Sequence, residues 1–375
     1  MSEIQLIDLK QQLQCIKERV DRRIQDVLAH GKFILGPEVA ELEKNLAQFS
    51  GVKHAVTCAN GTDALLLCLM ALNVRAGDVI FCPSFTFAAT AEVVPCLGAI
   101  PYFVDVNKGD FNLNLESLKV AISSARTEGL KARGIIAVDL FGLPADYDGI
   151  QKIADAEDLF VIADSAQAYG AKFRGKVTGA LGDLATTSFF PAKPLGCYGD
   201  GGAILTDDDD LAELLVSLRF HGKGSDKYDN ERIGMNSRLD TLQAAILLEK
   251  ILIYEDEIKS RNRVAARYQE GINPENFLIP KVPDGRESVW AQYTLTALTP
   301  ELRDAAVAKL KDGGVSTAVY YPRPLHLQAA YSQFPSSPSG LPVSEELSNT
   351  VFSIPMHPYL DSVSQERIIG LLNAI

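Results

Sequence analysis

Short apolar runs alternate with longer amphipathic runs along most of this chain, and this alternation constrains the fold more than any other feature. The apolar runs read as strands at residues 79–82, 100–104, 134–141 and 159–164. The amphipathic runs read as helices at residues 88–97, 115–122 and 147–156. Repeats of this kind predict an α/β fold, with a mostly parallel central sheet flanked by helices on both faces.

The pattern changes in the last third of the chain. A long apolar helical pattern begins near Leu242, and we expect this helix to extend past Arg263 and to connect a large domain to a small one. Beyond it the pattern reads strand, helix, strand and terminal helix, at residues 293–298, 300–311, 315–320 and from Ser364. We therefore expect a large domain over residues 1–250 and a smaller α+β domain over residues 251–375.

Composition excludes several classes of function. The 375 residues carry a formal net charge of −12 and no lysine/arginine block, so we expect neither nucleic-acid binding nor adsorption to anionic membranes. The cysteines form no C-x-x-C pair and the histidines have no metal-ligand spacing, so we expect free thiols and no metal site. A signal-peptide core and a membrane-length apolar run are both lacking, which predicts a cytoplasmic protein.

Lys193 is the most informative single residue. It stands between Pro191 and Pro194, and glycines follow at positions 196, 199, 201 and 202. The prolines break helical continuity on both sides, so we expect the lysine in a loop, where apolar neighbours partly bury it and lower its proton affinity. A neutral lysine can form a Schiff base with an aldehyde, which points to pyridoxal 5'-phosphate (PLP). A loop lysine paired with a surface carboxylate would have a similar sequence.

Asp164 follows the apolar run at residues 159–162. A buried parallel strand delivers a carboxylate to the C-terminal edge of its sheet in this way, and α/β enzymes bind ligands at that edge. A carboxylate there could keep the pyridine nitrogen of PLP protonated. Gln167, three residues later, could hydrogen-bond the ring hydroxyl. The alternative is that Asp164 caps the following helix.

Gly61 and Thr62 begin an apolar helical run. A helix start of this kind presents free backbone N–H groups and a hydroxyl to an anion, which suits the phosphate of PLP. Ser188, five residues before Lys193, offers a second hydroxyl. Residues 60–63 would also make a good plain turn and N-cap.

These motifs, in this order, resemble the fold-type I PLP enzymes and, among them, the DegT/StrS family of sugar-nucleotide aminotransferases. The similar segments cover nearly the whole chain, at residues 33–39, 59–62, 83–87, 164–167, 188–202, 236–245, 321–322 and 354–358. Residues 194–202 and 236–247 are most similar to one branch of the family. That branch aminates UDP-2-acetamido-2-deoxy-3-oxo-glucuronate for bacterial surface polysaccharide, such as the O-antigen of lipopolysaccharide.

The resemblance implies a transaminase that uses PLP, with L-glutamate as the amino donor. It implies that Lys193 carries the cofactor and moves protons, and that Asp164 holds the ring-nitrogen proton. The implied cofactor contacts are Gly61, Thr62, Phe87, Asp164, Gln167, Ser188, Lys193 and Asn236. Phe87 would stack on the cofactor ring, whereas without the resemblance it would read as a core phenylalanine.

The resemblance also implies a homodimer with shared active sites. Asn236 and Arg238 would reach the partner's site, where the arginine meets negative charge on the substrate; otherwise they read as a polar cluster at a helix start. Tyr320, Tyr321 and His326 would line the sugar pocket, and Tyr320 stands where many relatives have histidine. The alternatives are an aminotransferase for a dTDP-linked 3-oxo- or 4-oxo-6-deoxyhexose, a PLP-dependent sugar dehydratase, in which histidine replaces the lysine, and a non-catalytic regulator.

Overall fold

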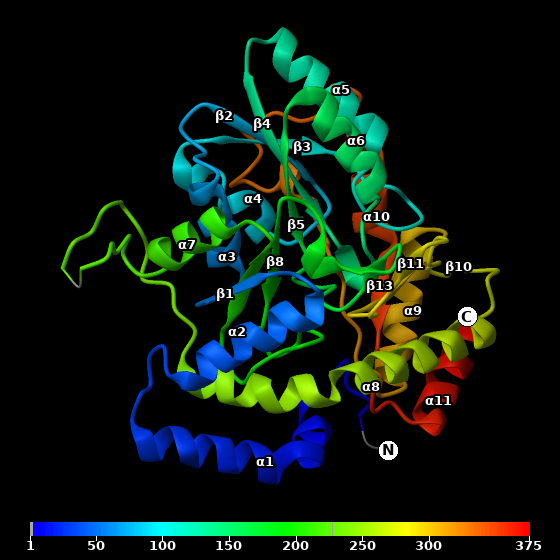
Figure 1. Ribbon diagram of the computed structural model, residues 1–375. Coiled ribbons are helices and arrows are strands. Elements are labelled where there is room, and N and C mark those ends of the chain that lie inside the picture. The colour runs from blue at the N-terminus through cyan, green and yellow to red at the C-terminus, as the bar shows by residue number, and fades with distance from the viewer. Residues whose placement is uncertain (1–2, 227) are drawn as a thin grey trace.

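A central, mostly parallel sheet organises the protein (Figure 1). The computed structural model describes residues 3–226 and 228–375, and these form a seven-stranded sheet in the order β1-β9-β8-β5-β4-β2-β3. Its strands are β1 (His54–Cys58), β2 (Asp78–Pro83), β3 (Ile100–Val104), β4 (Lys131–Val138), β5 (Phe160–Asp164), β8 (Leu184–Ser188) and β9 (Gly202–Thr206). Only β9 runs against the others, between β1 and β8. The predicted fold class is confirmed.

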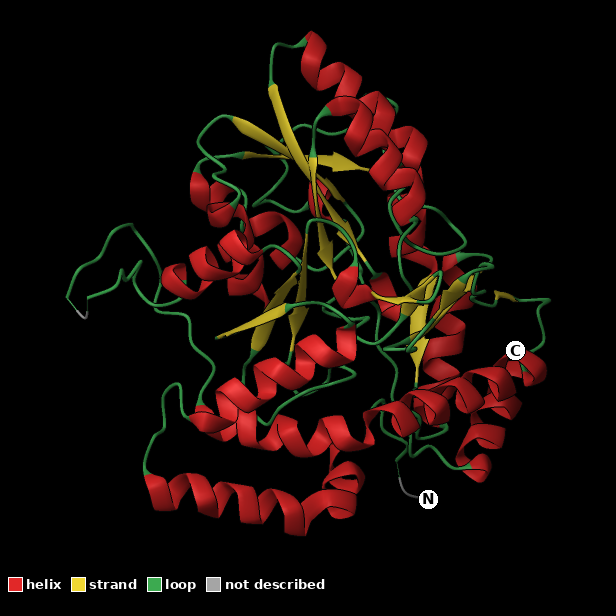
Figure 2. Cartoon of the chain, in the orientation of Figure 1, coloured by secondary structure: helices red, strands yellow, loops and turns green. Residues whose placement is uncertain are grey.

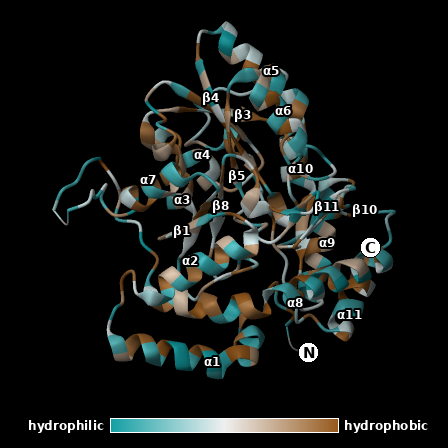
Figure 3. Ribbon diagram, in the orientation of Figure 1, coloured by the Kyte–Doolittle hydropathy of each residue, from teal (hydrophilic) through white to brown (hydrophobic). Residues whose placement is uncertain are grey.

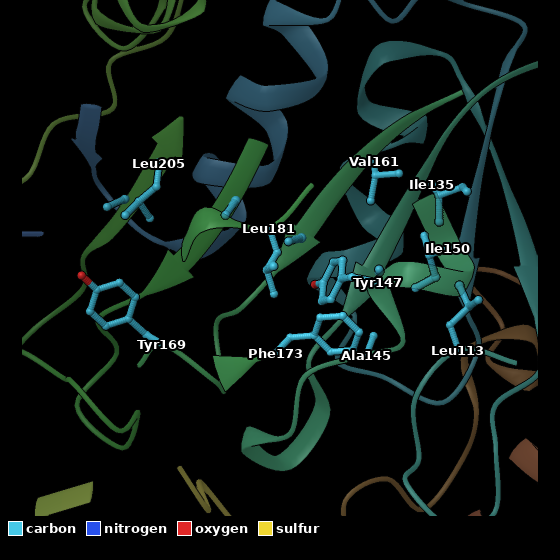
Figure 4. Packing of buried hydrophobic residues seen from close by; sticks show 14 of the residues in the cluster. Leu113, Ile135, Ala145, Tyr147, Ile150, Val161, Tyr169, Phe173, Leu181 and Leu205 are labelled. Carbon is cyan, nitrogen blue, oxygen red and sulfur yellow. The ribbon is translucent and has the colours of Figure 1, made fainter. Parts of the chain in front are cut away.

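Helices cover both faces of this sheet (Figure 2). One face packs against α3 (Gly61–Ala71), α4 (Ala89–Glu92) and α7 (Asp209–Leu218). The other packs against α2 (Pro37–Ser50), α5 (Leu115–Thr127), α6 (Tyr147–Glu157) and the first half of α8 (Thr241–Gly271). Strand β5 is apolar up to Asp164 because both of its faces are buried: Val161 and Ala163 enter one core, in which Figure 4 labels Val161, and Ile162 enters the other.

A second core lies in the C-terminal part of the chain. Its sheet has the order β10-β12-β13, and α9 and α11 pack against it. The bounds here are β10 (Phe277–Leu278), β12 (Tyr293–Ala297), α9 (Pro300–Asp312), α10 (Pro342–Thr350), β13 (Val351–Ile354) and α11 (Ser362–Asn373). A small three-stranded sheet joins β11 (Arg286–Glu287) to β6 (Lys172–Phe173) and β7 (Lys176–Val177).

Helix α8 contributes to both cores. Leu247 and Leu248 pack in the core of the large sheet, whereas Val264 and Tyr268 pack in the C-terminal core. The first half of α8 is accordingly apolar, while most of α1 (Leu9–His30), which packs against it, is hydrophilic (Figure 3). The predicted boundary at residue 250 falls inside this helix, and the division into two domains stays a prediction.

Three predicted elements differ from the structure. The strand expected at residues 134–141 ends as β4 at Val138, and a 3-10 turn follows at Leu140–Gly142. The helix expected at residues 88–97 ends as α4 at Glu92, and a short 3-10 turn follows at Pro95–Leu97, because the ring of Pro95 cannot continue an α-helix. The strand expected at residues 315–320 does not form. Instead, Val315 makes a single bridge with Ile4, and Ala318 makes one with Ser353. Among the described helices, none combines the length and apolar character needed to cross a membrane.

Candidate active site

A cavity of about 920 Å³ lies at the C-terminal edge of the central sheet. Strands β4, β5 and β8 end at this cavity with Val138, Asp164 and Ser188. This is the edge at which parallel α/β sheets bind ligands. Nine of the predicted site residues line it: Gly61, Thr62, Phe87, Asp164, Gln167, Ser188, Lys193, Tyr320 and Tyr321.

Lys193 lies in a turn, as its flanking prolines predict. Its backbone N–H donates to the carbonyl of Phe190 at 2.8 Å. Burial lowers the pKa of the Lys193 amine, while the nearby carboxylate of Asp164 raises it. Among the residues that the structure describes, the amine takes part in no hydrogen bond or close ion pair. A lysine with this environment can lose its proton and act as a nucleophile.

Asp164 is buried at the end of β5. Its Oδ2 accepts a hydrogen bond from the Thr90 hydroxyl at 3.0 Å, and its Oδ1 accepts one from the Ala166 N–H at 3.2 Å. Burial raises the pKa of this carboxyl group, whereas both hydrogen bonds and the charge of Lys193 lower it. Asp164 therefore faces the cavity and also caps a turn at residues 166–170; the alternative that it caps a following helix is wrong, because β6 and not a helix follows this turn.

The N-terminus of α3 forms an anion cradle. Asn60 caps the helix by accepting the Asp63 N–H at 2.8 Å, but the N–H groups of Gly61 and Thr62 have no protein partner within the described chain. A Cβ added at Gly61 would lie 2.7 Å from the Cβ of Ser188, so only glycine lets the serine approach so closely. Two free N–H groups and two hydroxyls at a helix N-terminus suit a phosphate group.

Aromatic and amide side chains form another wall of the cavity. Phe87 is 54% exposed, and its ring centroid lies 6.5 Å from that of Tyr321. This exposure disfavours the alternative that Phe87 is a core residue. Gln167 accepts the Phe141 N–H at 2.8 Å and donates to the Tyr321 hydroxyl at 3.0 Å, so its amide is held in one orientation. Because one Gln167 N–H is already used, only the other is available to a ligand.

Three predicted residues lie off this cavity wall. Asn236 is exposed, and the guanidinium carbon of Arg238 lies 5.0 Å from the centroid of the Phe220 ring. The prediction that His326 lines the pocket is not supported. Its Nδ1 lies 2.7 Å from Ser84 Oγ and its Nε2 lies 3.2 Å from Glu345 Oε1, so both ring nitrogens are already engaged.

The cavity also contains residues that the sequence did not indicate. Gln292 and Gln328 line it, and Thr90 donates to Asp164 from the helix behind Phe87. Phe87 lies before the first residue of α4, so helical spacing did not relate it to Thr90, and no local motif indicated the contact of Thr90 with Asp164. The two glutamines follow no recognisable motif. Among the described residues, no cluster of His, Cys, Asp or Glu side chains is arranged to hold a metal ion.

Comparison with known proteins identifies the family. The sequence model of the DegT/DnrJ/EryC1/StrS aminotransferase family matches residues 14–373. This chain belongs to that family. It is 46% identical, over 98% of its own length and 99% of the relative's, to the UDP-2-acetamido-2-deoxy-3-oxo-D-glucuronate aminotransferase of Pseudomonas aeruginosa.

Two further relatives also match nearly the whole chain. A pleiotropic regulatory protein of Geobacillus stearothermophilus is 40% identical, over 98% of this chain and 96% of the relative. A crystal structure of a DegT/DnrJ/EryC1/StrS aminotransferase from Brucella abortus superposes with a TM-score of 0.97 at 50% identity, covering 99% of both chains.

The chain is therefore a PLP-dependent aminotransferase, and its cavity fits the cofactor. The free N–H groups at the start of α3 suit a phosphate, and the buried Asp164 carboxylate suits a protonated ring nitrogen. Phe87 presents an exposed aromatic face, and the Lys193 amine suits an aldehyde.

Proposed function

We propose that this enzyme transfers an amino group from L-glutamate to a keto sugar nucleotide. The best candidate acceptor is UDP-2-acetamido-2-deoxy-3-oxo-glucuronate, and the product would serve synthesis of a bacterial surface polysaccharide, such as the O-antigen of lipopolysaccharide. We propose further that the enzyme works in the cytoplasm as a homodimer.

The observation that carries this proposal is the placement of an amine, a carboxylate and a phosphate cradle in one cavity. Lys193, Asp164 and the Gly61–Thr62 helix start come from three separate segments, yet all line the same 920 Å³ space. A nucleophilic lysine with a depressed pKa beside a buried aspartate is the arrangement that PLP chemistry requires.

Each side chain has a defined task in this proposal. When bound, PLP supplies an aldehyde that carries the amino group and a ring that accepts electrons from the reacting carbon. Asp164 holds a proton at the ring nitrogen, and the hydrogen bond from Thr90 keeps the carboxylate ionised. Lys193 Nζ takes a proton from the donor Cα and returns it on the cofactor side, which requires an amine that can be neutral. Phe87 orients the ring by stacking on its face.

The acidic character of the cavity supports a shared site. Among the described residues that line the cavity, Lys193 is the sole cationic side chain, whereas Asp63, Asp164 and Asp200 are acidic. PLP, a nucleotide diphosphate and a uronate are all anions, so they need further positive charge. We propose that Asn236 and Arg238 provide polar and cationic contacts to the partner's site. Tyr320, Tyr321, Gln292 and Gln328 would then surround the sugar.

The experiment has two parts. Borohydride treatment of the purified protein should fix the cofactor to one peptide, which contains Lys193; reduction onto another lysine would overturn the assignment of Lys193. The pyridoxamine-loaded enzyme is then tested against a panel of keto sugar nucleotides. Conversion of the UDP-linked uronate supports the proposal. Preference for a dTDP-linked 3-oxo- or 4-oxo-6-deoxyhexose would keep the aminotransferase assignment and overturn the substrate.

A regulatory role without turnover is the remaining alternative, since one relative is named as a regulatory protein. The presence of Lys193 opposes a dehydratase, in which histidine replaces the lysine. A half-reaction with L-glutamate that converts the bound cofactor to its amino form would exclude such a regulator.

A further inference from the structure

Lys250 is a buried cation that the proposed chemistry leaves unused. It lies on α8 and is only 1% exposed. Its ammonium donates a hydrogen bond of 2.6 Å to the carbonyl of Gly196 and lies 4.1 Å from the centroid of the Tyr198 ring. Both contacts are with the loop that carries Lys193. A buried lysine is costly unless it is well paired, so its presence under this loop needs a reason.

Helix α8 holds this loop at a second point. Gln243 accepts the backbone N–H of Tyr198 at 2.9 Å, and a Cβ at Gly199 would lie 2.9 Å from the Gln243 amide. Gln243 and Lys250 are two helical turns apart and therefore share a face of α8. Gln243 thus binds the N–H at one end of the segment 196–198, and Lys250 binds the carbonyl at the other end.

Glu257 lies two further turns along the same face of α8, and it balances the charge of Lys250. It is buried, and it accepts hydrogen bonds from Gln12 at 2.9 Å and from the Tyr359 hydroxyl at 2.5 Å. Its carboxylate raises the pKa of Lys250, although the larger effect of burial lowers that pKa to about 8. The ammonium is therefore charged at neutral pH and close to losing its proton.

We propose that Lys250 is a positioning residue that holds the Lys193 loop against α8. Its ammonium anchors the Gly196 carbonyl and the Tyr198 ring, so that the segment following Lys193 has one conformation. Lys250 touches neither substrate nor cofactor in this role. The inference rests on the proposed function of Lys193, but it is tested on the backbone of the loop.

The first test is amide hydrogen exchange in the full-length, cofactor-bound protein. Lys250→Met should accelerate exchange of the Cys197 and Tyr198 amides by about tenfold, because a charge-assisted anchor is lost. Exchange in β5 should not change, and Lys250→Arg should restore much of the protection. Lys259→Met is the matched control, since Lys259 is an exposed lysine on the same helix with a surface ion pair to Asp256.

The second test is kinetic. Lys250→Met should lower kcat by about tenfold while the KM for the keto sugar stays within about twofold, because the loop positions the amine and leaves the sugar contacts intact. Unchanged loop exchange in Lys250→Met would overturn the inference. Equal acceleration in the loop and in β5 would overturn it too, because that result means general destabilisation.

A third test needs no variant, in case Lys250→Met does not fold. In the wild-type protein, protection of the Cys197 and Tyr198 amides, corrected for intrinsic base catalysis, should fall as the pH rises through about 8, where Lys250 loses its proton. The two titratable side chains of the loop that face Lys250 stay protonated there, because burial raises the pKa of Cys197 to about 11 and that of Tyr198 to about 12. Constant protection up to pH 10 would contradict the inference. Borohydride labelling tests Lys193 separately, so the two proposals can fail independently.

Discussion

The Thr90 hydroxyl donates a hydrogen bond of 3.0 Å to Oδ2 of Asp164, across the wall of the active-site cavity. Thr90 comes from α4 and Asp164 from the end of β5, 74 positions later in the chain. Burial raises the pKa of this carboxyl group, and the threonine is one of the few groups that lower it again. Thr90 therefore helps to keep Asp164 ionised in a site that disfavours charge.

Thr90→Val should move the acidic limb of the kcat profile to higher pH. Loss of the donor raises the pKa of Asp164, so a smaller fraction is ionised at any pH near that value. A hydrogen bond to a charged group is worth roughly 1.5–3 kcal/mol, so its loss is large enough to be seen in the profile. Thr187→Val is the control, because the Thr187 hydroxyl is buried and has no hydrogen-bond partner among the described residues. Equal profiles for the two variants would contradict the role of Thr90.

Asp164→Asn should preserve the fold and disable the chemistry. A neutral amide cannot hold the ring-nitrogen proton, and loss of one preorganised charge contact costs about 10²–10³-fold in kcat. Folding should not suffer. Burial raises the pKa of Asp164 in the folded state above its value in the unfolded chain. The folded state therefore loses stability as the pH rises from the unfolded-state pKa through the folded-state pKa, because the carboxylate becomes charged while it is buried. Asparagine never ionises, so the cofactor-free variant should melt no lower than wild type at neutral pH. Wild-type turnover would show that Asp164 only caps its turn.

Most of the site residues that the sequence predicted lie in short local motifs. Prolines around Lys193 and the apolar run before Asp164 each act over a few residues, so their consequences could be read directly. Thr90 and Gln292 could not be found in this way, because their positions depend on how distant segments pack. His326 shows the opposite case: the resemblance assigns it to the sugar pocket, whereas its ring contacts Ser84 and Glu345, 242 and 19 positions away, and its role at the pocket stays a prediction.

The fold shows the same division between local and distant effects. Alternating apolar and amphipathic runs predicted β2 to β5 and the helices between them, because each element buries a characteristic face. The segment at residues 315–320 has strand-like residues but finds only single bridges to Ile4 and Ser353. A strand needs a continuous partner, and the sequence of the strand itself does not supply one.

Subunit mixing should reveal whether the active site is shared. Lys193→Ala and Asn236→Ala should each be a poor enzyme as a homodimer. If Asn236 serves the partner's site, a heterodimer carries both lesions in one site and neither in the other. Random reassociation of equal amounts then recovers about a quarter of wild-type activity. Lys193→Ala mixed with itself is the control. Heterodimers that form but stay inactive would show that Asn236 acts within its own chain.

Arg238 tests the identity of the substrate. A uronate carboxylate is a planar acceptor that a guanidinium can bind through two N–H groups, and loss of this contact costs about 1.5–3 kcal/mol. Arg238→Ala should therefore lower kcat/KM for the UDP-linked uronate by at least about tenfold, and much less for the matching hexose without the carboxylate. Lys223→Ala is a matched control, because Lys223 also lies over the Phe220 ring, at 5.7 Å, and its loss should affect both sugars alike. An equal loss of activity on both sugars in Arg238→Ala would contradict this role. The arginine would then bind a group that the two sugars share, such as the diphosphate, and would not select a uronate.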